Sequence, residues 1–165
     1  MIKRITKLDV ILSVLLLFVP LILIILNREI RTSISDYAYS KYNYVFVMLL
    51  TVAGMMFIFN GSSYKEKWYN IILGLSLIGV AITPHKDFSI LHYIFASIFF
   101  IGSVFTMVWY SSQKQRWFKI IAGNIVLSAL LIHFIFKSYT LFYAEWIGIL
   151  PITIHFIGES IGKID

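Results

Sequence analysis

Five ionisable side chains, at or near the ends of apolar runs, have the types needed to bind a metal or transfer a proton. They are Asp36, His85, Asp87, His92 and Glu145. Imidazoles and carboxylates together bind divalent metals and perform general acid–base catalysis. A metal held by these groups would activate water against a lipid ester or amide. The sequence thus raises one enzymatic hypothesis, a membrane-embedded metal-dependent hydrolase.

The stretch around Pro84 also has a purely structural interpretation. Pro84 ends one helix, and Asp87 or Ser89 can cap the next. His85 and His92 are seven positions apart, which is not a recognised metal-ligand spacing. We therefore expect His85 and Asp87 to be ordinary loop residues unless they join a metal site.

His92 and Glu145 are the strongest site candidates because each belongs to an apolar run. His92 shares a helical face with Ala96, Ser103 and Thr106. Such a face packs against other helices rather than lipid, so His92 either stabilises packing or belongs to a site. Glu145 enters the membrane from the same side as His92. We expect the two to form a buried polar centre. Because histidine titrates near neutral pH, a direct contact between His92 and Glu145 would act as a proton-sensitive latch.

Two further polar groups complete the candidate site residues. Asp36, Tyr37 and Tyr39 fall in the polar and aromatic stretch TSISDYAYSKYNY and are expected at the mouth of a cleft. His155 and Glu159 are four positions apart, so on a helix they form a second polar stripe.

The elements that must position these residues are six apolar runs. The chain has 165 residues, of which 59% are hydrophobic and 13% charged, against about 25% charged in soluble domains. A transmembrane helix needs roughly 20 mainly apolar residues. The runs cover residues 9–26, 44–59, 68–83, 90–110, 117–136 and 141–161. We predict an all-α, polytopic membrane protein in which residues 1–165 form a single six-transmembrane-helix bundle with short connections.

The distribution of Lys and Arg predicts the orientation. Nine of the 14 lie on the side of the N-terminus if all six runs span the membrane. The positive-inside rule then places both termini in the cytoplasm of a multi-pass plasma (inner) membrane protein. This rule, together with anionic lipid headgroups, also accounts for the net charge of +6, so binding to nucleic acid is not expected. No phosphate-binding glycine loop is present and no cofactor is expected.

Several segments carry a resemblance to known proteins. They are SISDYAYS at 33–40, VFVMLLTVAGMMFIFNG, the pattern G-x-x-x-T-P, LHYIFASIFF, and a closing E-W…F-I-G-E-S-I-G-K. In this order they resemble an uncharacterised bacterial six-span inner-membrane protein family of unknown function, over about two-thirds of the chain. The H-x-x-x-A after residue 91 and the Glu-Trp of the last run are faintly similar to the DRAM/Sfk membrane-protein superfamily.

The resemblance implies a six-helix bundle and dealings with lipid, but no established catalytic residues. Six positions match recurring ones in the family, whereas His155 and Glu159 are particular to this chain. The matching residues are Ser35, Asp36, Tyr37, Tyr39, His92 and Glu145.

The function that we expect is non-enzymatic: binding or moving a lipid or small amphiphile through an outward-facing polar cleft. Membrane lipids and a small amphiphilic ligand are the expected partners, together with another membrane protein or a second copy. The two alternatives are the metal-dependent hydrolase and a structural or assembly partner of another membrane protein.

Overall fold

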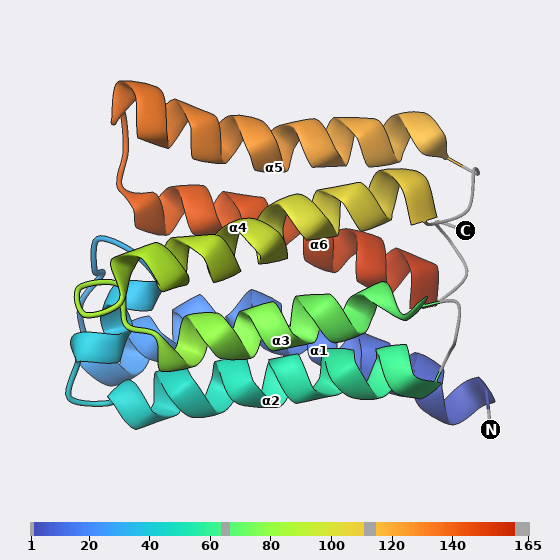
Figure 1. Cartoon of the computed structure of the whole chain (residues 1–165), viewed down its shortest axis with the longest axis horizontal. Helices are drawn as coiled ribbons and strands as arrows, with labels where there is room; N and C mark the ends of the chain where they lie inside the picture. Colours follow the sequence, from blue (N-terminus) through green and yellow to red (C-terminus); the bar gives the residue numbers. More distant parts are fainter. Residues whose placement is uncertain (1, 64–66, 111–114, 161–165) are drawn as a thin grey trace.

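The computed structural model of the chain is a bundle of helices lying side by side (Figure 1). The helices are α1 (Ile2–Asn27), α2 (Asn43–Ser63), α3 (Tyr69–Ile82), α4 (Ser89–Phe105), α5 (Arg116–Phe136) and α6 (Leu141–Ser160). A 3-10 helix, η1 (Ser35–Tyr39), follows α1, and a π-helical turn (Thr106–Tyr110) continues α4. The structure describes residues 2–63, 67–110 and 115–160, and within these not the side chains of 2–9 and 159–160. The predicted all-α class is confirmed.

Five of the six helices are long and apolar enough to cross a membrane. They are α1, α2, α4 with its π-helical turn, α5 and α6. The exception is α3, whose 14 residues extend only about 21 Å at 1.5 Å per residue. The hydrocarbon core of a bilayer is about 30 Å thick. Six spanning helices were expected. By length and composition, five of the described helices meet this expectation and α3 does not.

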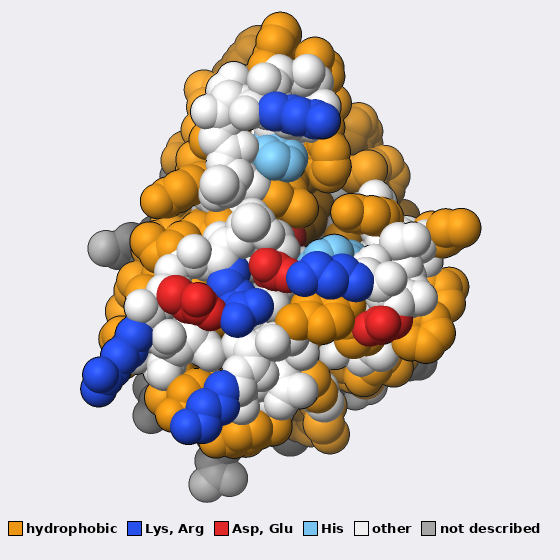
Figure 2. Space-filling model, turned by 90° about the vertical axis from the view of Figure 1, so that its left-hand side faces the viewer, with side chains coloured by type: hydrophobic (Ala, Val, Ile, Leu, Met, Phe, Trp, Pro, Cys, Tyr) orange, Lys and Arg blue, Asp and Glu red, His pale blue; other side chains and the backbone are white. Residues whose placement is uncertain are grey.

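One end of the bundle gathers three connections from distant parts of the chain. They are residues 28–42, which include η1, and residues 83–88 and 137–140 (Figure 1). We call this the η1 end. The start of α1 and the end of α6 lie at the opposite end. Figure 2 views the η1 end face-on: charged side chains and histidines gather there, whereas hydrophobic side chains dominate the flanks.

Glycines allow α2 and α3 to pack closely. A Cβ atom added to Gly54 would lie 2.7 Å from the carbonyl oxygen of Gly74, and one added to Gly74 would collide with the backbone oxygen of Gly54. Between the same helices the buried amide of Asn70 donates to Asn60 Oδ1 at 2.9 Å. Small residues and buried polar pairs are the usual means by which membrane helices associate.

The helices α4 and α5 are much less closely packed. Along its length α5 lies against α6, but it meets α4 over a far shorter stretch. The two helices therefore diverge toward the η1 end, and the space between them is bounded by the start of α6. This divergence creates the cavity described next.

Candidate functional site

A cavity of about 790 Å³ lies at the η1 end between α4, α5 and α6. Its volume is within the roughly 300–1,000 Å³ of typical ligand pockets. Besides two tyrosines, Tyr93 and Tyr139, the ionisable side chains that line it are His85, His92, His133, Lys137 and Glu145. Farther from the η1 end the lining is mostly apolar, with Ala96, Phe100 and Ile101 from α4 and Leu127, Leu130 and Leu131 from α5. The cavity thus has a polar end and an apolar end.

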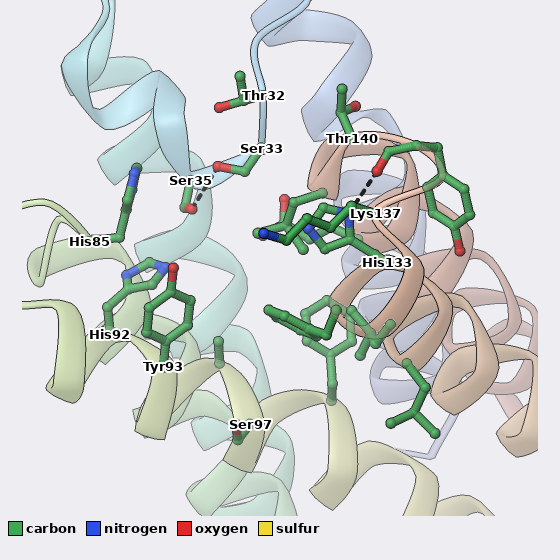
Figure 3. Close-up of a pocket in the computed structure, with 18 of the residues that line it drawn as sticks. Thr32, Ser33, Ser35, His85, His92, Tyr93, Ser97, His133, Lys137 and Thr140 are labelled. Atoms are coloured by element: carbon green, nitrogen blue, oxygen red, sulfur yellow. Dashed lines mark hydrogen bonds between the residues drawn. The ribbon is translucent and has the colours of Figure 1, made fainter.

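Two histidines on opposite sides of this cavity are held in the same way (Figure 3). His92 is buried in α4, and its Nδ1 lies 2.7 Å from the carbonyl oxygen of Thr83. His133 of α5 has its Nδ1 2.7 Å from the carbonyl oxygen of Tyr139. Because a carbonyl only accepts hydrogen bonds, each Nδ1 must carry a proton. In the neutral ring Nε2 is then an acceptor.

Glu145 lies one turn into α6 and joins the first loop to the cavity. Its Oε2 accepts a hydrogen bond from the backbone N–H of Ile34 at 2.5 Å. Glu145 also lines, with His92, a second and smaller cavity of about 50 Å³. The two predicted partners therefore line the same space, but among the described contacts neither bonds to the other. Each instead bonds to the backbone, so the structure contains no direct latch.

Asp36 is buried in η1 and anchors the connection before α4. Its Oδ1 lies 3.1 Å from Lys86 Nζ and 3.8 Å from His85 Nε2, and its Oδ2 accepts from the Thr32 hydroxyl at 3.0 Å. Burial alone would raise the pKa of Asp36, but the hydrogen bonds from Lys86 and Thr32 and the nearby positive charges hold it below its ordinary value. Asp36 is therefore ionised at neutral pH and does not line the cavity.

Burial lowers the pKa of His85, and the attraction of Asp36 offsets this only in part. The ring is thus favoured in its neutral form. It packs edge-on against Tyr39, with ring centroids 5.4 Å apart, and lies 5.8 Å from His92. His85 joins the cavity wall, contrary to the expectation of an ordinary loop residue.

The two tyrosines stabilise the loops rather than line the cavity. Tyr37 is fully buried and its hydroxyl donates to the carbonyl of Glu29 at 2.6 Å. The Tyr39 hydroxyl donates to Asp87 Oδ2 at 3.1 Å and accepts from the backbone N–H of Lys86 at 2.7 Å. The predicted cap is therefore wrong: Phe88 precedes α4 without a side-chain cap, and Asp87 bonds to Tyr39 instead.

The metal-site hypothesis lacks a ligand cluster. Among the side chains that the structure describes, no three His, Asp or Glu residues are grouped to hold a metal ion. Asp36 pairs with Lys86, and Asp87 accepts its hydrogen bond from Tyr39. Two of the five proposed ligands are thus already engaged, by Lys86 and Tyr39.

The second predicted stripe lies apart from the cavity. His155 is buried in α6, farther toward the opposite end of the bundle, and it does not line the cavity. The side chain of Glu159 lies outside the described residues.

Sequence reasoning missed the contribution of the α5–α6 connection. Lys137 lines the cavity from the end of α5, where its backbone is in the left-handed region with φ 51°. Tyr139 folds back so that its hydroxyl donates to the carbonyl of Ala129 at 2.6 Å. The available signal was HFIFKSY, which brings His133, Lys137 and Tyr139 to the same side of the membrane as His92.

These features define the class: an all-helical bundle with five helices able to span a membrane and a cavity at one end. Residues 18–160 match the model of DUF7103, a family of unknown function, and the chain belongs to this family. The resemblance to an uncharacterised family is thus confirmed, whereas similarity to DRAM/Sfk proteins and a bacterial origin stay predictions. Searches of curated proteins and of solved structures gave no match.

Proposed function

We propose that this protein binds or moves a lipid or small amphiphile, with the polar head at the η1 end and the apolar chain between α4 and α5. The observation that carries the proposal is the division of one cavity into an ionisable end and an apolar end. A ligand matching that division has a polar head and a hydrocarbon chain.

The divergence of α4 from α5 supports a lateral route of entry. A hydrocarbon chain that leaves the bilayer between these two helices would reach Phe100 and Leu127 without crossing the charged η1 end. The positive-inside bias favours termini in the cytoplasm of a plasma (inner) membrane protein. In that orientation the η1 end lies in the outer leaflet and the cleft faces outward.

No specific observation favours the two alternatives. A metal-dependent hydrolase needs a ligand cluster, and the described side chains form none. A purely structural role in another assembly would not explain why one end of the cavity is ionisable and the other apolar. We therefore retain amphiphile binding alone.

Native mass spectrometry of the purified full-length protein tests the proposal, with monoacylglycerol as the probe. We expect adducts of one amphiphile on the wild-type chain and far fewer on Ser97→Phe, which places a ring in the cavity. The matched control is Ser128→Phe, because Ser128 is an exposed serine on α5 that does not line the cavity. Equal adduct levels in both variants, or none on the wild-type chain, would contradict the proposal.

A further inference from the structure

We propose that the polar end of the cavity recognises a head group that donates hydrogen bonds, a hydroxyl or an amine, and disfavours one that only accepts them, such as a sulfate. This inference rests on the proposed function and names the ligand class for the same site. It follows from the hydrogen bonds that the lining side chains already make within the protein.

The two histidines held by backbone carbonyls present acceptors. Nδ1 of His92 donates to Thr83 and Nδ1 of His133 donates to Tyr139, so Nε2 of each neutral ring can only accept a hydrogen bond. Both rings line the cavity, one from α4 and one from α5 (Figure 3). Each of these two walls thus carries an imidazole acceptor.

The acceptor of His92 is open to the space that the ring lines. The ring is only 3% exposed, and no carboxylate pairs with it among the described residues, so a positive charge there would be costly. The buried side-chain nitrogens that lack a hydrogen bond in the described part of the chain do not include its Nε2. Since no described group bonds to this Nε2 either, it is accessible to a donor on a ligand.

Two hydroxyl groups of the lining also present only acceptors. Thr32 donates its proton to Asp36 Oδ2 at 3.0 Å, and Tyr139 donates to the carbonyl of Ala129 at 2.6 Å. A hydroxyl carries one proton, so toward a ligand these two oxygens can only accept. In either protonation state the Glu145 carboxyl adds acceptor oxygen and no positive charge. Acceptors therefore come from every segment that surrounds the polar end.

The remaining polar side chains do not reverse this character. Hydroxyls such as those of Tyr93 and Thr140 donate as well as accept, so they suit either kind of group on a ligand. Lys137 is the only Lys or Arg among the described lining residues, and it is exposed. Exposed charges are hydrated and screened, so an ion pair there contributes little.

The lining therefore lacks protons rather than lone pairs. A hydroxyl or amine on the ligand brings the protons that these acceptors need, whereas a head that only accepts leaves them without partners. Two kinds of amphiphile share the required chemistry, those with a glycerol or sugar head and those with a primary amine.

Competition among four probes with the same hydrocarbon chain tests the inference. Monooleoylglycerol carries two hydroxyls and oleylamine an amine, whereas propyl oleate has no donor and oleyl sulfate is an anion that only accepts. Pairs in equal amounts are incubated with the full-length protein, and bound species are counted by native mass spectrometry. The detergent is lauryldimethylamine oxide above neutral pH, because its head offers no donor that would compete.

We expect monooleoylglycerol, oleylamine or both to be preferred about tenfold over propyl oleate and over oleyl sulfate, the factor that one hydrogen bond supplies. The direct competition of monooleoylglycerol with oleylamine then distinguishes a hydroxyl head from an amine head.

A histidine variant assigns the preference to the cavity. In His133→Asn the amide can still donate to the Tyr139 carbonyl from the position of Nδ1, but no group replaces Nε2. The preference for monooleoylglycerol over propyl oleate should fall about fivefold, while propyl oleate binds as before. The matched control is His155→Asn, because His155 is a buried histidine of α6 that does not line the cavity. It should retain the full preference.

The outcomes separate the two proposals. If propyl oleate or oleyl sulfate binds as well as both donor probes, the inference is overturned and amphiphile binding stays intact. An undiminished preference in His133→Asn, or an equal loss in His155→Asn, also overturns it. If no amphiphile binds at all, both proposals are overturned. The competition in the wild-type chain decides even if a variant fails to fold.

Discussion

A carboxyl oxygen of Glu145 accepts a hydrogen bond from the backbone N–H of Ile34, a residue 111 positions earlier in the chain. This single contact joins the start of α6 to the loop that precedes η1. The backbone reinforces the connection nearby, because the N–H of Phe142 donates to the carbonyl of Thr32 at 2.8 Å. The wall of the cavity therefore depends on a contact between two ends of the sequence.

Glu145→Ala should destabilise the protein because it leaves the N–H of Ile34 buried without an acceptor. Such a loss costs about 1–3 kcal/mol. Glu145→Gln retains a side-chain oxygen that can accept the same hydrogen bond, so it should lose much less. Unfolding by denaturant in detergent measures both free energies. An alanine variant as stable as the glutamine variant would show that the contact contributes nothing.

Tyr39→Phe should lower the free energy of unfolding by about 1 kcal/mol, since one hydroxyl makes two hydrogen bonds to the connection before α4. Tyr42→Phe is the matched control, because the side-chain contacts found for Tyr42 involve only its ring. The same denaturant experiment compares the two. If both variants lose equal stability, the clamp between η1 and residues 83–88 is not energetically significant.

The contribution of His85 to the stability of the η1 end should fall as the pH is lowered from 7.5 to 5.5. Burial lowers the pKa of His85 in the folded protein, whereas the unfolded chain takes up this proton near pH 6.5. The unfolded state therefore binds more protons at His85 in this range, and this contribution to folding stability is lost as the pH falls. Asp36 does not contribute there, because its lowered pKa in the folded protein and its ordinary pKa of about 3.9 in the unfolded chain both lie below this range.

His85→Gln isolates this effect. The variant retains every other titrating group, so subtracting its pH dependence from that of the wild-type chain leaves the contribution of His85. We expect a smaller decrease of melting temperature between pH 7.5 and 5.5 in the variant. An identical decrease in both proteins would exclude His85 as a source of the pH dependence.

The sequence predicted the helices well because a bilayer demands long apolar runs, and five such helices are present. The predicted run 68–83 agrees with α3 (Tyr69–Ile82) within one residue at each end, but its 14 residues are fewer than the roughly 20 that a transmembrane helix needs. The all-α class and the approximate bounds were thus accessible from the sequence, whereas the assignment of this run as a spanning helix was not supported.

The site was predicted only in part, for two physical reasons. His92 and Glu145 were identified because polar groups in apolar runs are costly and so need a purpose. Their actual partners, Thr83 and Ile34, are backbone groups, which every residue carries and no pattern reveals. Lys137 was counted only as a loop charge, since nothing in its surroundings predicts the left-handed turn that brings it to the cavity.

Gly74→Ala should strongly destabilise the packing of α2 on α3. The added methyl group would meet the backbone oxygen of Gly54, which cannot move without displacing the helix. Overpacking of this kind costs about 1–3 kcal/mol. Gly102→Ala should be milder, because its new methyl would meet only the end of the Leu73 side chain, at 2.9 Å. Equal losses in thermal unfolding would contradict this account of the helix interface.

Photoaffinity labelling tests the central claim most directly. A single-chain amphiphile with a photoreactive group near the end of its chain is activated in membranes containing the full-length protein, and labelled peptides are sequenced. Binding in the cavity predicts labels at the apolar wall, on residues 96–101 of α4 and 127–134 of α5. Labels spread evenly over other exposed apolar positions, such as Met48 of α2 and Ile154 of α6, would show that lipid meets only the outer surface and would contradict the claim.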